Sequence, residues 1–154
     1  MDAKVTWKGL LAFEAVGNSD LPVMMDSNSD PSVRRGPGPM EMVAMSLAGC
    51  TAMDVISILG KKKQDVTNFE VKVHAERAGE HPKVYTHAEI EYQVTGHAVD
   101  EAAVLRAIEL SVQKYCSVHA MLSQSFPTTQ RYVIFEDDGD GARHVVSEGD
   151  YIEK

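Results

Sequence analysis

The sequence predicts an α+β protein with antiparallel sheets and two central helices. Residues 69–75 and 84–94 alternate strictly between apolar and polar side chains, as strands do when they bury one face and expose the other. Residues 39–60 are apolar on nearly every side, and residues 101–114 carry an apolar stripe at helical spacing. A doubly wound parallel sheet is disfavoured, because the sequence contains few helices and its strands alternate clearly between apolar and polar residues.

Two strands and a loop are predicted before the first helix. Residues 5–16 place apolar side chains on alternate positions and are interpreted as one edge or paired strand. A short second strand is expected at residues 22–25. Residues 26–39, DSNSDPSVRRGPGP, crowd together the residue types that favour loops.

The first helix has clear end signals. Pro39 suits the first helical position, Glu41 lies in the first turn, where the helix dipole favours an acid, and Gly60 suits the end. Its only charges are Glu41 and Asp54, so we expect it to lie in the middle of the protein. The mostly apolar stretch 42–59 falls short of the ~20 residues of a membrane span, which favours a core helix.

The second helix is expected to begin after Asp100, which can cap it. Ser117 is the expected cap of a further helical piece over residues 119–122. The buried stripe predicted for the second helix consists of Val104, Ile108, Ser111, Val112 and Tyr115.

Turns and two more strands complete the predicted fold. Residues 79–82 supply a turn between the two alternating strands. Residues 131–135 and 144–146 are expected to be strands, separated by the acidic turn EDDGDG.

Composition narrows the class of protein. The chain of 154 residues suits a single domain spanning 1–154, and its net charge of −8 argues against a nucleic-acid or anionic-membrane partner. The start, MDAKVTWKGL, has no basic segment followed by an apolar run, so no signal peptide is expected. Two cysteines in such a chain indicate reduced thiols and a cytoplasmic location.

The two cysteines, Cys50 and Cys116, are the main candidates for chemistry. A thiolate is a nucleophile that can be oxidised to a sulfenic acid, which a second thiol converts to a disulfide. If the two sulfurs meet in the fold, the protein is a thiol redox enzyme. If they do not, both cysteines are small buried hydrophobic residues.

Positive charge near the cysteines favours the redox interpretation. Arg34 and Arg35 lie in the loop that leads into the first helix, and a guanidinium can stabilise a thiolate at neutral pH. If Ser117 caps a helix, Cys116 lies beside the positive end of that helix.

Histidines offer a weaker alternative. His119 follows Cys116 by three residues, so a Cys–His nucleophile pair is conceivable, but the surrounding sequence does not support hydrolase chemistry. The histidines show no zinc-ligand spacing with a supporting cysteine, so we expect neither a metal nor a cofactor.

Two segments resemble a known family. The block GPGPMEMVAMSLAGCTAMDVISIL and the later YCSVHAML are similar to the OsmC/Ohr family of organic hydroperoxide reductases, over residues 36–60 and 110–122. The resemblance implies an intertwined homodimer with two active sites at the interface. It also implies an antioxidant oxidoreductase of the oxidative stress response, which reduces alkyl and lipid hydroperoxides with redox-active cysteines.

The resemblance also implies residue roles. Cys50 matches the peroxidatic position and Cys116 the resolving one. The family uses an arginine before the first helix to activate the thiolate; spacing does not decide between Arg34 and Arg35, and we favour Arg35 because it is closer to the helix start.

The expected acid is displaced by one residue. Well-studied members have a glutamate directly after the helix-start proline, paired with that arginine. Here Met40 follows Pro39 and the acid is Glu41, a shift that turns a helical side chain by ~100°. Glu41 either fills this role from an altered position or leaves it vacant.

The sequence therefore predicts a thiol-dependent peroxidase. The substrate is an organic hydroperoxide, and the reductant is an external dithiol or a lipoylated protein. The alternative is a non-catalytic protein of the stress response that binds a hydrophobic ligand on the same dimeric scaffold, with its Met-rich helix lining an apolar pocket.

Overall fold

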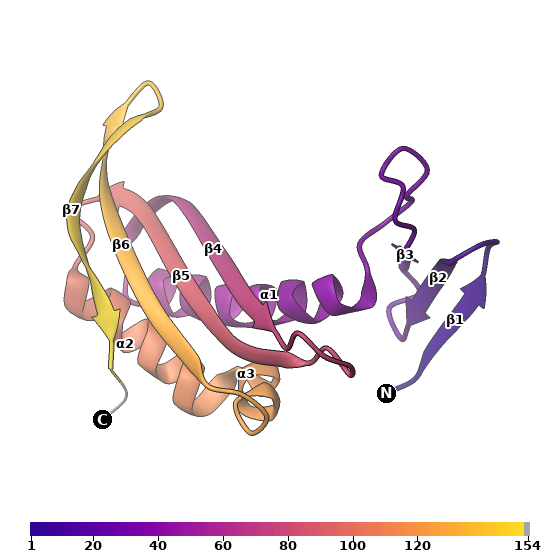
Figure 1. Cartoon of the computed structure of the whole chain (residues 1–154). Helices are drawn as coiled ribbons and strands as arrows, with labels where there is room; N and C mark the ends of the chain where they lie inside the picture. The colour runs from indigo at the N-terminus through magenta and orange to yellow at the C-terminus, as the bar shows by residue number, and fades with distance from the viewer. Residues whose placement is uncertain (153–154) are drawn as a thin grey trace. The chain divides into compact units, whose positions relative to one another are not determined.

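The computed structural model describes residues 1–152 and divides the chain into two compact units (Figure 1). The first unit is Met1–Val43, and the second begins at Ala44. The elements follow the predicted order: strands, a long helix, two strands, further helices and two final strands. The prediction of an α+β protein is confirmed.

The first unit is a three-stranded antiparallel sheet of β1 (Ala3–Trp7), β2 (Ala12–Gly17) and β3 (Pro22–Asp26). The prediction of one strand over residues 5–16 is wrong, because the chain reverses at Gly9 and Leu10, whose φ angles are 101° and 49°. The Trp7 indole N–H donates to the Leu10 carbonyl at 2.9 Å and closes this turn. The apolar alternation belongs to two paired strands.

Helix α1 (Pro39–Lys61) begins where predicted. The Gly38 carbonyl accepts from the Met42 N–H, and the Glu41 carboxylate accepts from the Gly38 N–H at 2.6 Å, which is the glutamate half of a capping box. α1 crosses from the first unit into the second.

The end of α1 differs from the prediction, since Gly60 lies inside the helix. Lys63 takes the left-handed conformation instead, with φ 56°. The Gln64 and Lys63 N–H groups donate to the Leu59 and Gly60 carbonyls, which is the Schellman pattern of a helix end.

The second unit is built on a four-stranded sheet. Its strands, in spatial order, are β4 (Asp65–Arg77), β5 (Tyr85–His97), β6 (Thr128–Gly139) and β7 (Ala142–Tyr151). β4–β5 and β6–β7 pair antiparallel, but β5–β6 is parallel, which differs from the predicted antiparallel sheet. The parallel pairing follows from the helical crossover between these strands, which returns the chain to the same end of the sheet.

That crossover contains three helical pieces: α2 (Glu101–Leu110), the π-helix η1 (Ser111–Tyr115) and α3 (Ser117–Leu122). Asp100 caps α2 as predicted, since its carboxylate accepts from the Ala102 N–H. The predicted helix to residue 114 is wrong at its end, because the α-helical turn gives way to η1 after Leu110. Tyr115 consequently leaves the predicted stripe and is exposed.

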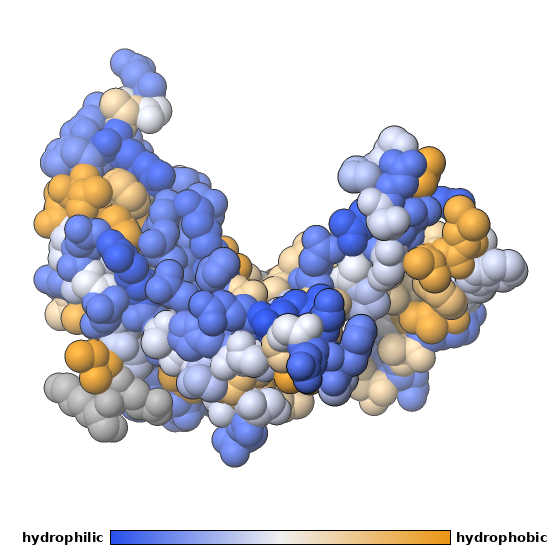
Figure 2. Space-filling view, viewed as in Figure 1, coloured by the Kyte–Doolittle hydropathy of each residue, from blue (hydrophilic) through white to orange (hydrophobic). Residues whose placement is uncertain are grey.

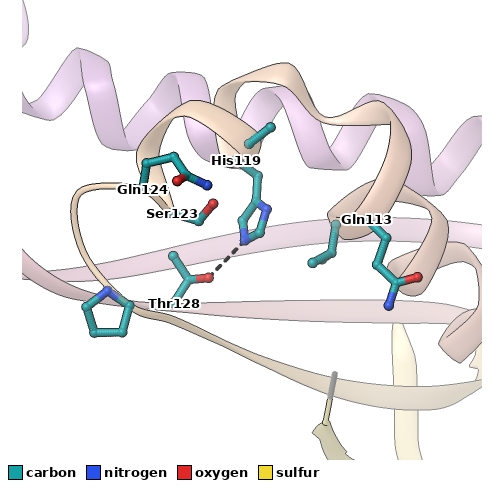
Figure 3. A pocket seen from close by; sticks show the side chains of 8 residues that line it. Gln113, His119, Ser123, Gln124 and Thr128 are labelled. Carbon is teal, nitrogen blue, oxygen red and sulfur yellow. Dashed lines mark hydrogen bonds between the residues drawn. The ribbon is translucent and has the colours of Figure 1, made fainter. Parts of the chain in front are cut away.

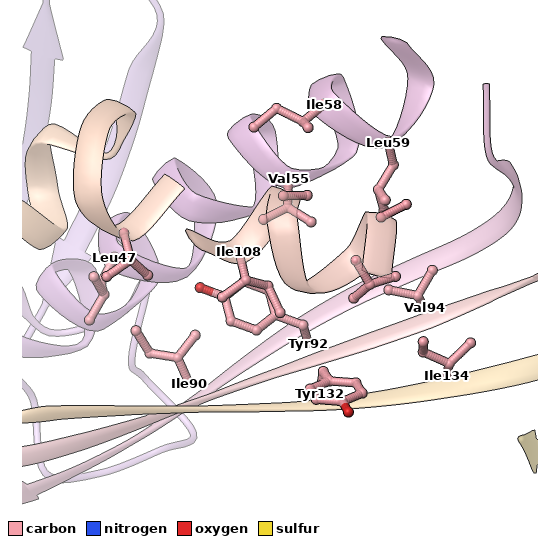
Figure 4. Packing of buried hydrophobic residues seen from close by; sticks show 14 of the residues in the cluster. Leu47, Val55, Ile58, Leu59, Ile90, Tyr92, Val94, Ile108, Tyr132 and Ile134 are labelled. Atoms are coloured by element: carbon pink, nitrogen blue, oxygen red, sulfur yellow. The ribbon is translucent and has the colours of Figure 1, made fainter. Parts of the chain in front are cut away.

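The core of the second unit lies between the sheet and the helices (Figure 4). Leu47, Val55 and Leu59 of α1 pack there at helical spacing. They meet residues of β5 and α2, which are Ile90, Tyr92, Val94, Val104 and Ile108. α1 is therefore a core helix along one side, as expected.

The other side of α1 is uncovered within one chain. Met45 and Met53 are 58% and 72% exposed. Among the described residues, α1 is the one helix long and apolar enough, by length and composition, to cross a membrane. Its stripe in the core supports the predicted core helix, but the expected cover on every side is not present in a single chain.

Candidate active site

The fold brings the two cysteines together. Cys50 lies on α1, and Cys116 lies between η1 and α3, more than sixty residues away in the sequence. The two sulfur atoms and a carboxylate oxygen of Asp54 all lie within 4.8 Å of one another. Two thiols at this separation can be joined by a disulfide after a small movement. Two sulfurs and a carboxylate are also a donor set that a metal ion could bridge.

The π-helix positions Cys116. Its N–H donates to the Ser111 carbonyl, five residues earlier, at 2.9 Å. The chain then leaves the helix, with Cys116 in an extended conformation. Single π-turns of this kind are frequent at functional sites.

Cys116 is itself the cap of α3. Its Sγ accepts from the His119 main-chain N–H at 3.3 Å, so the prediction of Ser117 as the cap is wrong by one residue. The expectation that Cys116 lies at the N-terminus of this helix is confirmed. This contact favours the thiolate form.

Burial acts in the opposite direction. Cys116 is only 2% exposed, and burial raises the pKa of its thiol well above the ordinary value. The neighbouring Cys50 and Asp54 raise this pKa further, while the His119 N–H lowers it. Cys116 is therefore a thiol at neutral pH. Cys50 is half-buried and the more accessible of the two.

A chain of hydrogen bonds runs beside the sulfurs. The Tyr92 hydroxyl lies 2.7 Å from Thr51 Oγ1, which lies 2.9 Å from Ser111 Oγ. Ser111 in turn donates to the Asp54 carboxylate at 3.0 Å. Thr51, Tyr92 and Ser111 are fully buried, and burial strongly raises the pKa of Tyr92. The Tyr92 hydroxyl is thus protonated and able to donate.

His119, the weaker candidate for a partner of Cys116, contacts it through the main chain. Its main-chain N–H contacts Cys116, whereas its ring Nε2 lies 2.9 Å from Thr128 Oγ1 (Figure 3). The ring lines an open, mostly polar pocket of about 720 Å³ with Gln113, Ser123 and Gln124. Neither cysteine lines this pocket.

The predicted charged residues lie in the first unit. Arg34 Nη2 lies 3.3 Å from Glu41 Oε2, and the Arg34 Nε donates to the Asp26 carbonyl. Arg35 instead donates from its guanidinium to the Lys8 carbonyl at 3.1 Å. Glu41 thus pairs with an arginine from its shifted position, and the arginine is Arg34.

Asp54 is a site residue that the sequence reasoning missed, since there it is only one of two charges in the first helix. It follows Cys50 by four residues, so the two side chains share a helix face. That spacing is a usable signal, but the approach of Cys116 and Ser111 depends on the tertiary structure.

Comparisons with known proteins agree with the fold. The profile of a family described as "OsmC-like protein" matches residues 29–131. "Protein YhfA" of Escherichia coli (strain K12) is 43% identical over 134 residues, covering 87% of this chain and 98% of its own.

Solved structures are similar as well. A hypothetical protein from Aquifex aeolicus VF5 superimposes with a TM-score of 0.79 at 27% identity, covering 89% of this chain and 97% of its own. The organic hydroperoxide resistance protein OhrB of Bacillus subtilis gives a TM-score of 0.57 at 13% identity, covering 86% and 98%. The latter likeness concerns the fold alone.

Proposed function

Since this chain belongs to the OsmC-like family, we propose that it is a thiol-dependent peroxidase that reduces organic hydroperoxides to alcohols. Cys50 is the peroxidatic residue and Cys116 the resolving one. The observation that carries the proposal is the convergence of the two sulfurs within 4.8 Å. OhrB of B. subtilis, an organic hydroperoxide resistance protein, shares the fold. The substrate class is proposed from the resemblance of the two cysteine segments to organic hydroperoxide reductases.

The reaction has two oxidative steps and a reset. The Cys50 thiolate attacks an oxygen of the hydroperoxide; an S–O bond forms, the O–O bond breaks, and the alkoxide takes a proton to leave as the alcohol. The Cys116 sulfur then displaces the hydroxyl from the Cys50 sulfenic acid and forms a disulfide. An external dithiol or a lipoylated protein reduces that disulfide by exchange.

The assignment of roles rests on the surroundings of each sulfur. The attacking residue must meet a substrate, and Cys50 is the more accessible cysteine. Cys116 is buried and protonated, which suits a residue that acts second.

A homodimer is part of the proposal. The uncovered face of α1 carries Met45, Met53 and Ile56, which a partner subunit would cover. The first unit also exposes apolar side chains, and Figure 2 shows orange patches on it. Its exposed apolar residues include Val5 of β1 and Leu10, Leu11 and Leu21 of the turns. A three-stranded sheet with so little buried core requires further cover.

A coupled assay tests the proposed activity. Reduced protein is mixed with cumene hydroperoxide and dithiothreitol, and peroxide loss is followed for the wild type and Cys50→Ser. We expect turnover that Cys50→Ser abolishes. Equal rates for the two proteins would contradict the proposal and favour a binder of hydrophobic ligands.

Labelling identifies the peroxidatic residue. After hydroperoxide, dimedone should label Cys50 in a Cys116→Ser variant, because the sulfenic acid persists when no second thiol is present. Label on Cys116 in Cys50→Ser, with none on Cys50 in the reciprocal variant, would reverse the two roles.

A further inference from the structure

We propose that Asp54 is the acid–base residue of this site: it accepts the proton of the Cys116 thiol and delivers it to the oxygen that leaves Cys50. The inference rests on the proposed function and adds a residue to it. Its basis is geometric, since a carboxylate oxygen of Asp54 lies within 4.8 Å of both sulfurs. At that range a proton can move through one intervening water.

The chemistry requires such a residue. Cys116 must lose its proton to attack, yet burial holds the thiol in the protonated form. The oxygen on Cys50 must gain a proton to leave as water. One carboxylate close to both sulfurs can accept the first proton and supply the second, and it ends the step unchanged.

The step balances. An S–S bond forms between Cys116 and Cys50, and the S–O bond of the sulfenic acid breaks. The Cys116 sulfur is oxidised and the Cys50 sulfur is reduced by the same amount. The proton passes from Cys116 to Asp54 and then to the departing hydroxide, so the products are a disulfide and water.

The buried hydroxyls orient the carboxylate. An ionised carboxylate can only accept hydrogen bonds, so Ser111 donates its single hydroxyl proton to Asp54. Thr51 must then donate to Ser111, and Tyr92 must donate to Thr51, over 2.9 and 2.7 Å. Each of these three hydroxyls therefore donates in the direction of Asp54. Ser111 and Thr51 are therefore positioning residues.

Asp54 also has access to solvent. It is half-buried and lines an open pocket of about 270 Å³, together with Ser57, Lys61 and Tyr115. A pocket with these polar groups can hold water next to the carboxylate. Protons can thus exchange with bulk solvent between turnovers.

Single-turnover quenching separates the two steps. Reduced wild type and Asp54→Asn are mixed with one equivalent of cumene hydroperoxide, quenched into dimedone over time and analysed by mass spectrometry. Asparagine keeps the size and still accepts from Ser111 but cannot take a proton. We expect undiminished peroxide consumption, disulfide formation slowed at least tenfold, and accumulation of Cys50 sulfenic acid.

Two variants keep the test decisive. Glu80→Gln makes the same chemical change at an exposed turn and should match the wild type. Ser111→Ala keeps the carboxylate but removes its donor, and we expect disulfide formation to slow severalfold. This second variant tests the inference even if Asp54→Asn fails to fold.

The outcomes distinguish this inference from the proposed function. Wild type that yields neither sulfenic acid nor disulfide would overturn both. Wild type that forms the disulfide while Asp54→Asn and Ser111→Ala form it equally fast would overturn the role of Asp54 alone.

Discussion

At the scale of residues, the two sulfurs lie close together in unequal surroundings. Cys116 is buried and its thiol pKa is raised, chiefly by that burial, whereas Cys50 is half-buried. Alkylation needs an accessible thiolate. We therefore expect iodoacetamide at neutral pH to modify Cys50 well before Cys116, as peptide mass spectrometry would measure. Equal labelling rates would show that the two environments are alike.

Thr51 links three buried polar groups. Thr51→Val keeps the shape but leaves the Tyr92 hydroxyl unable to donate and Ser111 without its donor. Unsatisfied buried groups cost about 1–3 kcal/mol, so the free energy of unfolding should fall by that amount in urea titrations at fixed protein concentration. Thr51→Ser, which keeps the hydroxyl, should lose much less. A stable Thr51→Val protein would mean that the chain of hydroxyls contributes little.

The arginines can be separated by substitution. Arg34 pairs with Glu41, while the Arg35 guanidinium is bound to the Lys8 carbonyl. The Glu41 pairing favours Arg34 as the activating residue, although sequence position favours Arg35. We expect Arg34→Met to slow peroxide reduction at least tenfold and Arg35→Met to change it little. If Arg35→Met were the slower variant instead, Arg35 would be assigned as the activating residue.

Only part of the site can be predicted from the sequence. The two cysteines can be identified from the chemistry of thiols and from the resemblance of their segments to the OsmC/Ohr family. Asp54 does not, because an acid in a helix is ordinary until Cys116 and Ser111 are known to approach it. Glu41 is displaced by one residue in the sequence, yet its carboxylate accepts from the Gly38 N–H and pairs with Arg34, which only the structure shows.

At the scale of elements, the alternation of apolar and polar residues locates both β4 and β5. β4 alternates between half-buried and exposed residues along most of its length, whereas β5 buries both of its faces from Tyr92 to Gly96. The π-helix is not predictable in this way. An inserted residue changes the backbone hydrogen bonding without changing the types of side chain. The apolar helical spacing of the sequence therefore continues past Leu110, although the α-helix ends there. The parallel pairing of β5 with β6 likewise depends on the crossover and not on either strand.

The π-turn suggests a direct test. Lys114 is exposed in η1, and an alanine inserted after it would lengthen the spacing between Ser111 and Cys116 from five residues to six. One added residue turns a helical side chain by about 100°, so the sulfur would rotate away from Cys50. We expect a folded protein, by circular dichroism, in which peroxide no longer yields the disulfide. Lys114→Ala, which keeps the spacing, should behave as wild type; disulfide formation in both would contradict this role.

At the scale of the whole molecule, the uncovered face of α1 predicts a dimer. Met53 is 72% exposed, and a carboxylate in its place would have to be buried at the interface. Sedimentation at micromolar concentration should show a dimer for the wild type and dissociation or unfolding for Met53→Glu. Glu80→Gln should stay dimeric. A stable, folded wild-type monomer would refute the prediction.

The central claim is that Cys50 and Cys116 form one redox pair. Its most direct test is the intact mass and thiol content of the reduced wild-type protein after one equivalent of cumene hydroperoxide. The account predicts that each chain loses two hydrogens and both free thiols, with a Cys50–Cys116 peptide recovered after proteolysis. Peroxide left unconsumed, with both thiols still titratable, would contradict it.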